Sequence, residues 1–163
     1  MSIEQLKDSH IISKVSDIIL ESEINPKNIQ IEVTESVAFN EDDLILQRIN
    51  ELKALGFSIS IDDFGTGHSS LSRLKLFPID LIKIDMEFVQ GISNESDKDK
   101  AIIRSIIQIS KNLEIDVLAE GVETEEQYEF LKSEGCKEIQ GYYFYKPMPA
   151  DAVKELLINN NEK

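Results

Sequence analysis

The chain lacks tryptophan, has a single cysteine, and carries much less positive than negative charge. Of its 163 residues, 17 are Lys or Arg and 31 are Asp or Glu, so its formal net charge is −14. This imbalance argues against a broad surface for duplex nucleic acid, because the electrostatic part of such binding would be unfavourable. It is compatible with a small phosphate ligand that is held through metal ions.

Two further shortages narrow the class of protein. With Cys136 as the only cysteine, a disulfide within the chain is excluded and a thiolate metal cluster has no support. No apolar run approaches the roughly 18 residues of a membrane span, and the N-terminal MSIEQLKDSH does not resemble a signal peptide. The length fits one domain, which we expect to occupy residues 1–163 with a frayed tail over about 157–163.

Five short apolar runs are typical of buried strands, and helical patterns separate most of them. This β-α alternation predicts an α/β fold with about five parallel strands. The carboxyl ends of parallel strands lie at the same edge of the sheet, so polar residues near those ends should lie close together. A cluster of carboxylates repels itself unless a divalent cation or bound protons neutralise it, so we predict a metal site. The polar residues near the strand ends are Glu32, Asp62, Asp63, Lys83, Asp85, Glu120 and Gln140.

Amphipathic patterns and capping residues predict the helices. Asn40 is a good N-cap, and Thr124 with Gln127 has the spacing of a capping box. Glycine or proline closes several of the patterns. The expected helices cover residues 10–23, 40–56, 69–76, 99–113, 124–135 and the segment that begins at 149.

The adjacent acids Asp62 and Asp63 are the sharpest functional candidates. One acid at a strand end is often only a helix cap, but this pair precedes the glycine-rich segment FGTGHSS, where the backbone can approach a ligand. Lys83 should lie at the same edge of the sheet, where it could orient water or stabilise a leaving oxygen. The alternative for Lys83 is a solvent-facing position on an edge strand.

Two pairs of glutamates repeat one spacing. Glu32 and Glu35 are three residues apart across a strand end, and Glu120 and Glu123 repeat this pattern. Within the first pair, one glutamate can bind metal while the other holds a loop. We predict that Glu35 holds residues 64–70 by accepting hydrogen bonds from them.

Five segments in order resemble the EAL-domain family of cyclic di-GMP phosphodiesterases. They are EVTES at 32–36, DDFGTGHSS at 62–70, KID at 83–85, EGVET at 120–124, and QGYYF with KPMP at 140–149. The resemblance implies a TIM-like (β/α) barrel that hydrolyses one phosphodiester bond of cyclic di-GMP to give linear pGpG. It also implies two Mg²⁺ or Mn²⁺ ions in a complete site.

Carried over to this sequence, the resemblance implies a role for each site residue. Asp62 would bridge two cations, and Lys83 would hold the nucleophilic water. The implied metal ligands are Glu32, Asp62, Asp63 and Glu120. The implied catalytic residues are Lys83, Glu35 and Glu123, and the implied substrate-binding residues are Gln140, Asp85 and Pro147.

The sequence also departs from the family pattern. It contains no Glu-Ala-Leu segment and lacks an Asn ligand of a following strand, so two metal ligands are missing. A whole barrel needs about 250 residues, and we therefore expect an incomplete barrel that is inactive alone. His68 replaces a common Tyr, and Met86 stands where a basic residue is frequent. Uncovered strand edges lead us to expect a homodimer or higher oligomer.

Two alternatives remain open. A catalytically degenerate EAL-like module would bind nucleotide or a partner protein without hydrolysis. A receiver-like signalling domain would have a five-stranded doubly wound sheet with an acidic pair, but it leaves EVTES and EGVET unexplained. The resemblance implies a cytoplasmic domain whose parent protein can carry sensory or cyclase domains and a membrane anchor.

Overall fold

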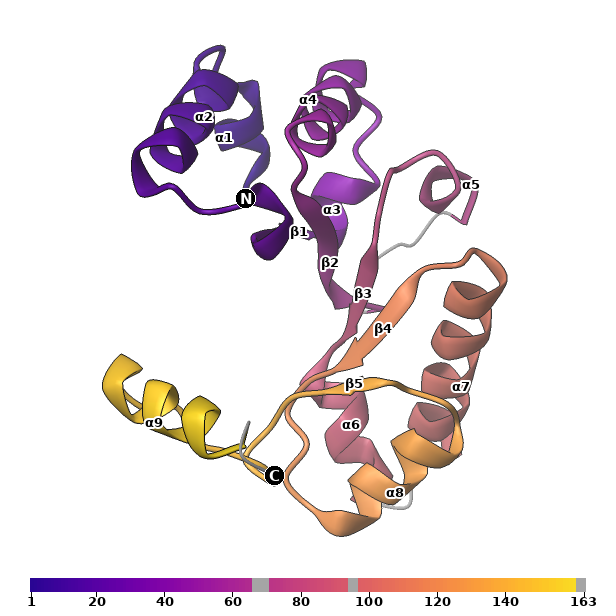
Figure 1. The fold of residues 1–163 in the computed structure, drawn as a ribbon. Helices are drawn as coiled ribbons and strands as arrows, with labels where there is room; N and C mark the ends of the chain where they lie inside the picture. The colour runs from indigo at the N-terminus through magenta and orange to yellow at the C-terminus, as the bar shows by residue number, and fades with distance from the viewer. Residues whose placement is uncertain (66–70, 94–96, 161–163) are drawn as a thin grey trace.

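The sheet consists of five parallel strands in sequential order. The computed structural model describes residues 1–65, 71–93 and 97–160 (Figure 1). The sheet order is β1-β2-β3-β4-β5, and every neighbouring pair is parallel. The α/β prediction is confirmed, and the unbroken order is that of a barrel wall rather than of a doubly wound receiver-like sheet. The strands are β1 Gln30–Thr34, β2 Ser58–Phe64, β3 Leu81–Ile84, β4 Asp116–Ala119 and β5 Glu138–Ile139.

Helices precede, separate and follow the strands. The longest of the described helices, α7, runs from Asp97 to Asn112 where a helix over 99–113 is predicted, and α8 begins at the predicted capping box of Thr124 and Gln127. The helices are α1 Ile3–Lys7, α2 Ile11–Ser22, α3 Glu35–Ala38, α4 Asp43–Ala54, α5 Leu71–Leu74, α6 Met86–Ser93, α7 Asp97–Asn112, α8 Glu125–Ser133 and α9 Ala150–Asn160, with a 3-10 turn η1 Pro26–Asn28.

Some helix ends differ from the prediction. Asp42, not Asn40, is the N-cap of α4, because its carboxylate accepts from the Leu44 amide while Asn40 accepts from the Asp42 amide. The last helix continues to Asn160, beyond the predicted start of fraying at 157, since extending a nucleated helix costs little. The predicted helix at 69–76 is α5, and its first two residues lie outside the described ranges.

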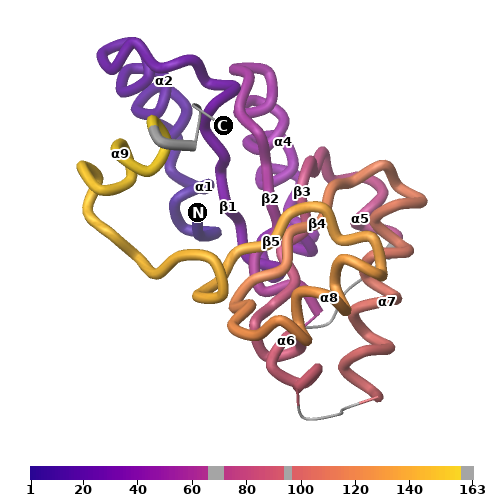
Figure 2. Tube along the Cα trace, turned by 60° about the horizontal axis from the view of Figure 1, so that its bottom comes forward, coloured from indigo at the N-terminus to yellow at the C-terminus, as the bar shows by residue number. Residues whose placement is uncertain are grey.

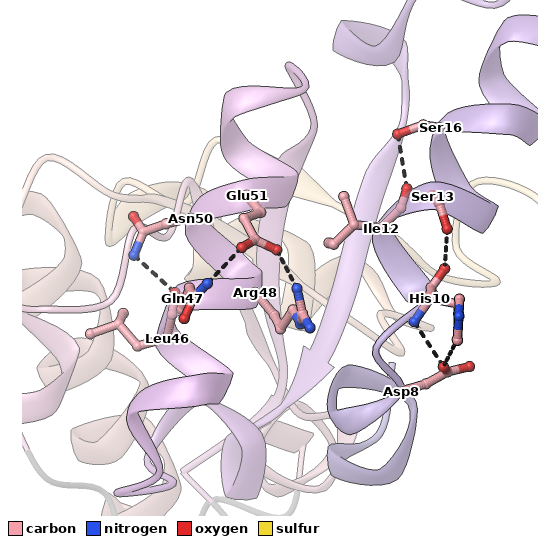
Figure 3. A network of polar contacts seen from close by, with 10 residues as sticks. All are labelled: Asp8, His10, Ile12, Ser13, Ser16, Leu46, Gln47, Arg48, Asn50 and Glu51. Atoms are coloured by element: carbon pink, nitrogen blue, oxygen red, sulfur yellow. Dashed lines mark hydrogen bonds and ion pairs between the residues drawn. The ribbon is translucent and has the colours of Figure 1, made fainter.

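Short polar contacts fix where α2 begins. Asp8, in the turn after α1, accepts a hydrogen bond from the His10 amide at 2.9 Å (Figure 3). It also forms an ion pair with Lys14 at 2.7 Å. On α4, Glu51 accepts from Gln47 and Arg48 in the same view. Each of these contacts joins residues close in sequence, so they stabilise the start of α2 and one face of α4 locally.

The core lies between the sheet and its helices. β2 and β3 contribute Ile59, Ile61, Ile82 and Ile84, all with 0% exposure, which matches strands covered on both faces. The outer edges of β1 and β5 pair with no other strand of the described residues, and α2 and α9 flank this open side (Figure 2). Within the described part of the chain, no helix is long and apolar enough to cross a membrane.

We predict that Cys136 is unreactive in the folded chain. Its thiol is buried and donates to the Glu138 carbonyl at 3.3 Å, and burial raises its pKa from 9.0 to about 11. The thiolate population near pH 8 should be about a hundredfold lower than in the unfolded chain. Reaction with a thiol reagent, with and without denaturant, measures this difference. Because the pKa is raised on folding, the associated stability is present below pH 9 and is lost as the pH approaches 11.

Equal reaction rates in the native and denatured chain would contradict the buried position of Cys136.

Candidate active site at the carboxyl ends of the strands

Four predicted site residues meet at one point. Glu32 from β1, Asp62 from β2 and Glu120 just after β4 each place a carboxylate oxygen 2.9 Å from the Lys83 Nζ on β3. These residues lie close together because the strands are parallel, so that the polar residue of each strand lies at the same edge of the sheet. An ammonium group has three N–H donors, so the three carboxylates can use all of them.

Lys83 lies at the buried centre of this group. Its side chain is 8% exposed, whereas those of Glu32, Asp62 and Glu120 are 48%, 29% and 21% exposed. Burial alone would lower the pKa of Lys83, but the hydrogen bonds to the three carboxylates outweigh burial and raise it. The lysine is therefore a permanent cation, and three carboxylates around one ammonium leave two negative charges.

A bulge in β2 separates the roles of the two adjacent aspartates. Ile61 pairs with Ile82 and Phe64 with Ile84, so β2 carries one additional residue here. Asp63 adopts a left-handed conformation with φ 55°. The pKa of Asp63 is raised, mainly by burial. The charge of Asp62 and a hydrogen bond with Asp85 raise it further. Asp63 therefore faces Asp85, while Asp62 faces Lys83.

Glu35 contacts the loop that follows β2. This first residue of α3 is 6% exposed, and its Oε2 accepts a hydrogen bond from the Gly65 amide at 3.0 Å. The sequence predicts such a contact for residues 64–70, and the structure shows it at Gly65. Residues 66–70, including His68, lie outside the described ranges.

The remaining predicted residues follow the carboxyl ends of β3, β4 and β5. Asp85 Oδ1 accepts from the Glu87 amide at 2.6 Å at the start of α6, and the Glu123 amide donates to Gln127 at the start of α8. Gln140 and Pro147 line one hollow of about 650 Å³, beside the first turns of α9. Four of the ten predicted residues thus share the centre, and the other six lie on the turns that follow the strands or near them.

Two glycines, which the sequence analysis did not single out, join the turns after β3, β4 and β5. A Cβ at Gly121 would lie 2.5 Å from the Met86 Cβ, and a Cβ at Gly141 would overlap the backbone of Val122. The Val122 amide donates to the Gln140 carbonyl, and the Tyr143 amide donates to the Val122 carbonyl. This close approach fixes the turn that carries Glu120.

We therefore predict that Gly141→Ala is strongly destabilising, by roughly 3 kcal/mol, because backbone atoms cannot avoid the new methyl group by changing rotamer. Gly135→Ala is the comparison variant, since a Cβ there meets nothing within 4 Å and only its φ of 88° opposes alanine. Gly135→Ala should lower the free energy of unfolding by about 1 to 2 kcal/mol. Urea unfolding of both variants measures the difference. A Gly141→Ala loss no larger than that of Gly135→Ala would contradict the close approach.

The donor chemistry of the site suits a hard divalent cation. Carboxylate oxygens are the ligands that Mg²⁺ and Mn²⁺ prefer. Within residues 1–65, 71–93 and 97–160, however, no group of three or more His, Cys, Asp or Glu side chains is arranged to hold a metal ion. The carboxylates surround Lys83 instead, so the described residues offer suitable donors but only part of a ligand set.

A sequential parallel sheet with acids and a lysine at its carboxyl edge defines a barrel-type α/β protein with a polar site at the strand ends. A family model described as EAL domain matches residues 1–147. The chain belongs to the EAL-domain family. This membership agrees with the five sequence segments and with the incomplete TIM-like barrel that they predict.

Similar proteins are known by sequence and by structure. The bifunctional diguanylate cyclase/cyclic di-GMP phosphodiesterase MucR of Pseudomonas aeruginosa is 40% identical over 153 residues, which are 94% of this chain and 22% of that protein. The PaMucR phosphodiesterase in its c-di-GMP complex has a TM-score of 0.88 at 40% identity, with 94% of this chain and 62% of that chain covered. A manganese/cy-diGMP complex of Klebsiella pneumoniae BlrP1 has a TM-score of 0.77 at 34% identity. The match covers 85% of this chain and 35% of that chain.

Proposed function

We propose that the chain forms the C-terminal part of a cyclic di-GMP phosphodiesterase site that produces linear pGpG. The observation that carries this proposal is the meeting of Glu32, Asp62 and Glu120 around Lys83 at the carboxyl edge of the sheet. The relative with a TM-score of 0.88 was solved in complex with c-di-GMP, which supports this ligand. Since the chain spans about a fifth of the length of relatives such as MucR, the activity of the whole protein is part of the proposal.

We assign the acidic residues to a pair of divalent cations, Mg²⁺ or Mn²⁺. Glu32, Asp62, Asp63 and Glu120 would hold them, with Asp62 shared between the two. Bound cations would neutralise charge that develops on the phosphate and would lower the pKa of the attacking water. The manganese complex of a 34% identical relative is consistent with this choice.

The other residues position the reactants. Lys83 would donate hydrogen bonds to the attacking water or to the leaving oxygen once the carboxylates release it. Glu35 would hold Gly65 and thereby the bulge at Asp63. The residues assigned to nucleotide binding are Gln140, Asp85 and Pro147, and Glu123 supports the turn that carries Glu120.

One observation favours a second candidate function. Lys83 already neutralises part of the carboxylate cluster, and the described residues make no complete metal site. A chain with this arrangement can bind a nucleotide or a partner protein without hydrolysing a phosphodiester. Binding of cyclic di-GMP without turnover would distinguish this function from the first.

A chimera tests the proposed activity. The part of the PaMucR phosphodiesterase domain that this chain does not cover would be joined to residues 1–163. With Mg²⁺ or Mn²⁺, we expect the chimera to convert cyclic di-GMP to pGpG, and residues 1–163 alone to give negligible product. A chimera that binds cyclic di-GMP but forms no pGpG would overturn the catalytic proposal.

We also propose that residues 1–163 associate through their uncovered edges. The outer edges of β1 and β5 carry backbone groups that no described strand pairs, and Leu157 and Ile158 on α9 are 58% and 52% exposed. Unpaired strand edges and exposed apolar area favour association with a second copy. Light scattering at micromolar concentration should show a dimer or larger species, whereas a stable monomer would contradict this. In the whole protein we expect further sensory or cyclase domains, and the name of the relative MucR includes a diguanylate cyclase.

A further inference from the structure

Asp80, immediately before β3, contacts three other elements at the amino edge of the sheet. Its carboxylate accepts a hydrogen bond from the Ile59 amide of β2 at 2.7 Å, and its own amide donates to the Ile59 carbonyl at 2.9 Å. Its carbonyl accepts from the Asp116 amide, at the start of β4, at 3.0 Å. Lys53 of α4 donates to both carboxylate oxygens, at 2.6 and 2.8 Å. One residue thus joins α4, β2 and β4 to the start of β3.

The bond to Ile59 should matter more than the ion pair with Lys53. The side chains of Lys53 and Asp80 are 31% and 39% exposed, and ion pairs at such positions add little to stability. Ile59 is 0% exposed, so its amide needs a partner within the fold. The Asp80 carboxylate takes the place of the backbone carbonyl that a longer β3 would offer to this amide. Loss of the carboxylate would therefore leave a buried donor unpaired where β2 and β3 begin to pair.

β3 depends on contacts at its ends for alignment, because it is short and mostly apolar. Its four residues are all buried, and Lys83 is the only polar one among them. A slip of β3 by one residue along β2 would exchange the two faces of the strand and move Lys83 out of the strand-end cluster. Asp80 and Ile59 stand three residues before Lys83 and Asp62, which is about 10 Å along each strand. The two hydrogen bonds between Asp80 and Ile59 therefore set which residue of β3 lies beside which residue of β2.

We propose that Asp80 is a positioning residue, which sets the register of β3 against β2 and thereby places Lys83 beside Asp62 and Glu120. Asp80 lies at the opposite edge of the sheet from the candidate active site and acts on it through the strands. The register can be tested without substrate or metal. What this register does for catalysis rests on the proposed function.

Hydrogen exchange at the Ile59 amide in residues 1–163 tests the first step. In Asp80→Ala, exchange at Ile59 should accelerate at least about tenfold more than the change in global stability explains. Asp80→Asn should restore most of the protection, since its side-chain carbonyl can still accept. Lys53→Met is the matched control, because it removes the ion pair and keeps the carboxylate. Ile59 exchange that follows global stability alone in Asp80→Ala, or that is equally fast in Asp80→Asn, would overturn the proposal.

The NMR shifts of the Lys83 and Asp62 amides test the register itself. Shifts of the folded chain do not respond to a loss of global stability, so they separate a positioning role from a merely structural one. Asp80→Ala should move both signals, while Asp80→Asn and Lys53→Met should leave them close to the parent positions. Unmoved signals in Asp80→Ala would overturn the proposal.

The parent chain provides a test if Asp80→Ala does not fold. A scalar coupling between the Ile59 ¹⁵N and the Asp80 carboxylate ¹³C is expected across their hydrogen bond. Its presence in the parent chain and in Asp80→Asn would support the proposal, and its absence from the parent chain would overturn it.

Turnover by the chimera connects the register to the proposed function. Asp80→Ala should lower kcat at least about tenfold, because a small misplacement of a group at the reaction centre costs that much or more. Lys53→Met should turn over like the parent chimera. Normal kcat in Asp80→Ala would overturn the positioning role. A parent chimera without turnover would count against the proposed function, and the exchange and shift measurements would still decide whether Asp80 sets the register.

Discussion

Asp62→Asn is expected to lower cyclic di-GMP hydrolysis by the chimera at least about a hundredfold. Even residues that only support a metal ligand commonly contribute ten- to hundredfold, and Asp62 is the residue that we assign to both cations. The amide of asparagine carries no charge and is a poorer bridge. The substitution also removes only one of the three negative charges around Lys83, so we expect the variant to fold.

The matched control for this variant is Asp116→Asn. Asp116 is an exposed acid of β4, which β3 separates from β2, and it lies at the amino end of its strand, away from the cluster. Turnover would be measured as pGpG formed at saturating Mg²⁺ and, separately, Mn²⁺. Ordinary turnover by Asp62→Asn under both conditions would remove Asp62 from the metal site and, with it, the two-metal assignment.

The sequence was most informative where structure depends on neighbours in the chain. The strands and the capping box of Thr124 and Gln127 are local patterns, and the structure confirms both. Parallel pairing then follows from the β-α alternation, so even the shared edge of the polar residues could be predicted. Short helices such as α1 and α3, with five and four residues, cannot show a helical period and were missed.

The geometry of the site could not be predicted, because it depends on contacts between distant segments. The central place of Lys83 requires three strands in register. The left-handed conformation of Asp63 results from a bulge against β3, and nothing in the local sequence marks it. The approach of Gly141 to Val122 depends on the turns after β4 and β5, and a glycine beside a strand is equally compatible with an ordinary turn.

Glu35→Ala is expected to loosen the segment after β2 and to reduce stability by about 1 to 3 kcal/mol, the usual cost of leaving a buried polar group without its partner. Glu35 is 6% exposed and accepts from the Gly65 amide, so alanine removes both the acceptor and buried volume. Glu35→Gln is the matched comparison, because its side-chain carbonyl has nearly the same position and can still accept. The loss of stability in Glu35→Gln should be clearly smaller than in Glu35→Ala.

Hydrogen exchange at the Gly65 amide distinguishes this local role from general destabilisation. In Glu35→Ala, exchange at Gly65 should accelerate by more than the change in global stability explains, and Glu35→Gln should retain most of the protection. Because Gly65 follows the Asp62–Asp63 bulge by two residues, a loosened Gly65 should also weaken binding of Mn²⁺ by the acids of β2. Unchanged Gly65 exchange in Glu35→Ala would mean that the carboxylate does not hold this segment. The bulge would then owe its shape to its pairing with β3 alone.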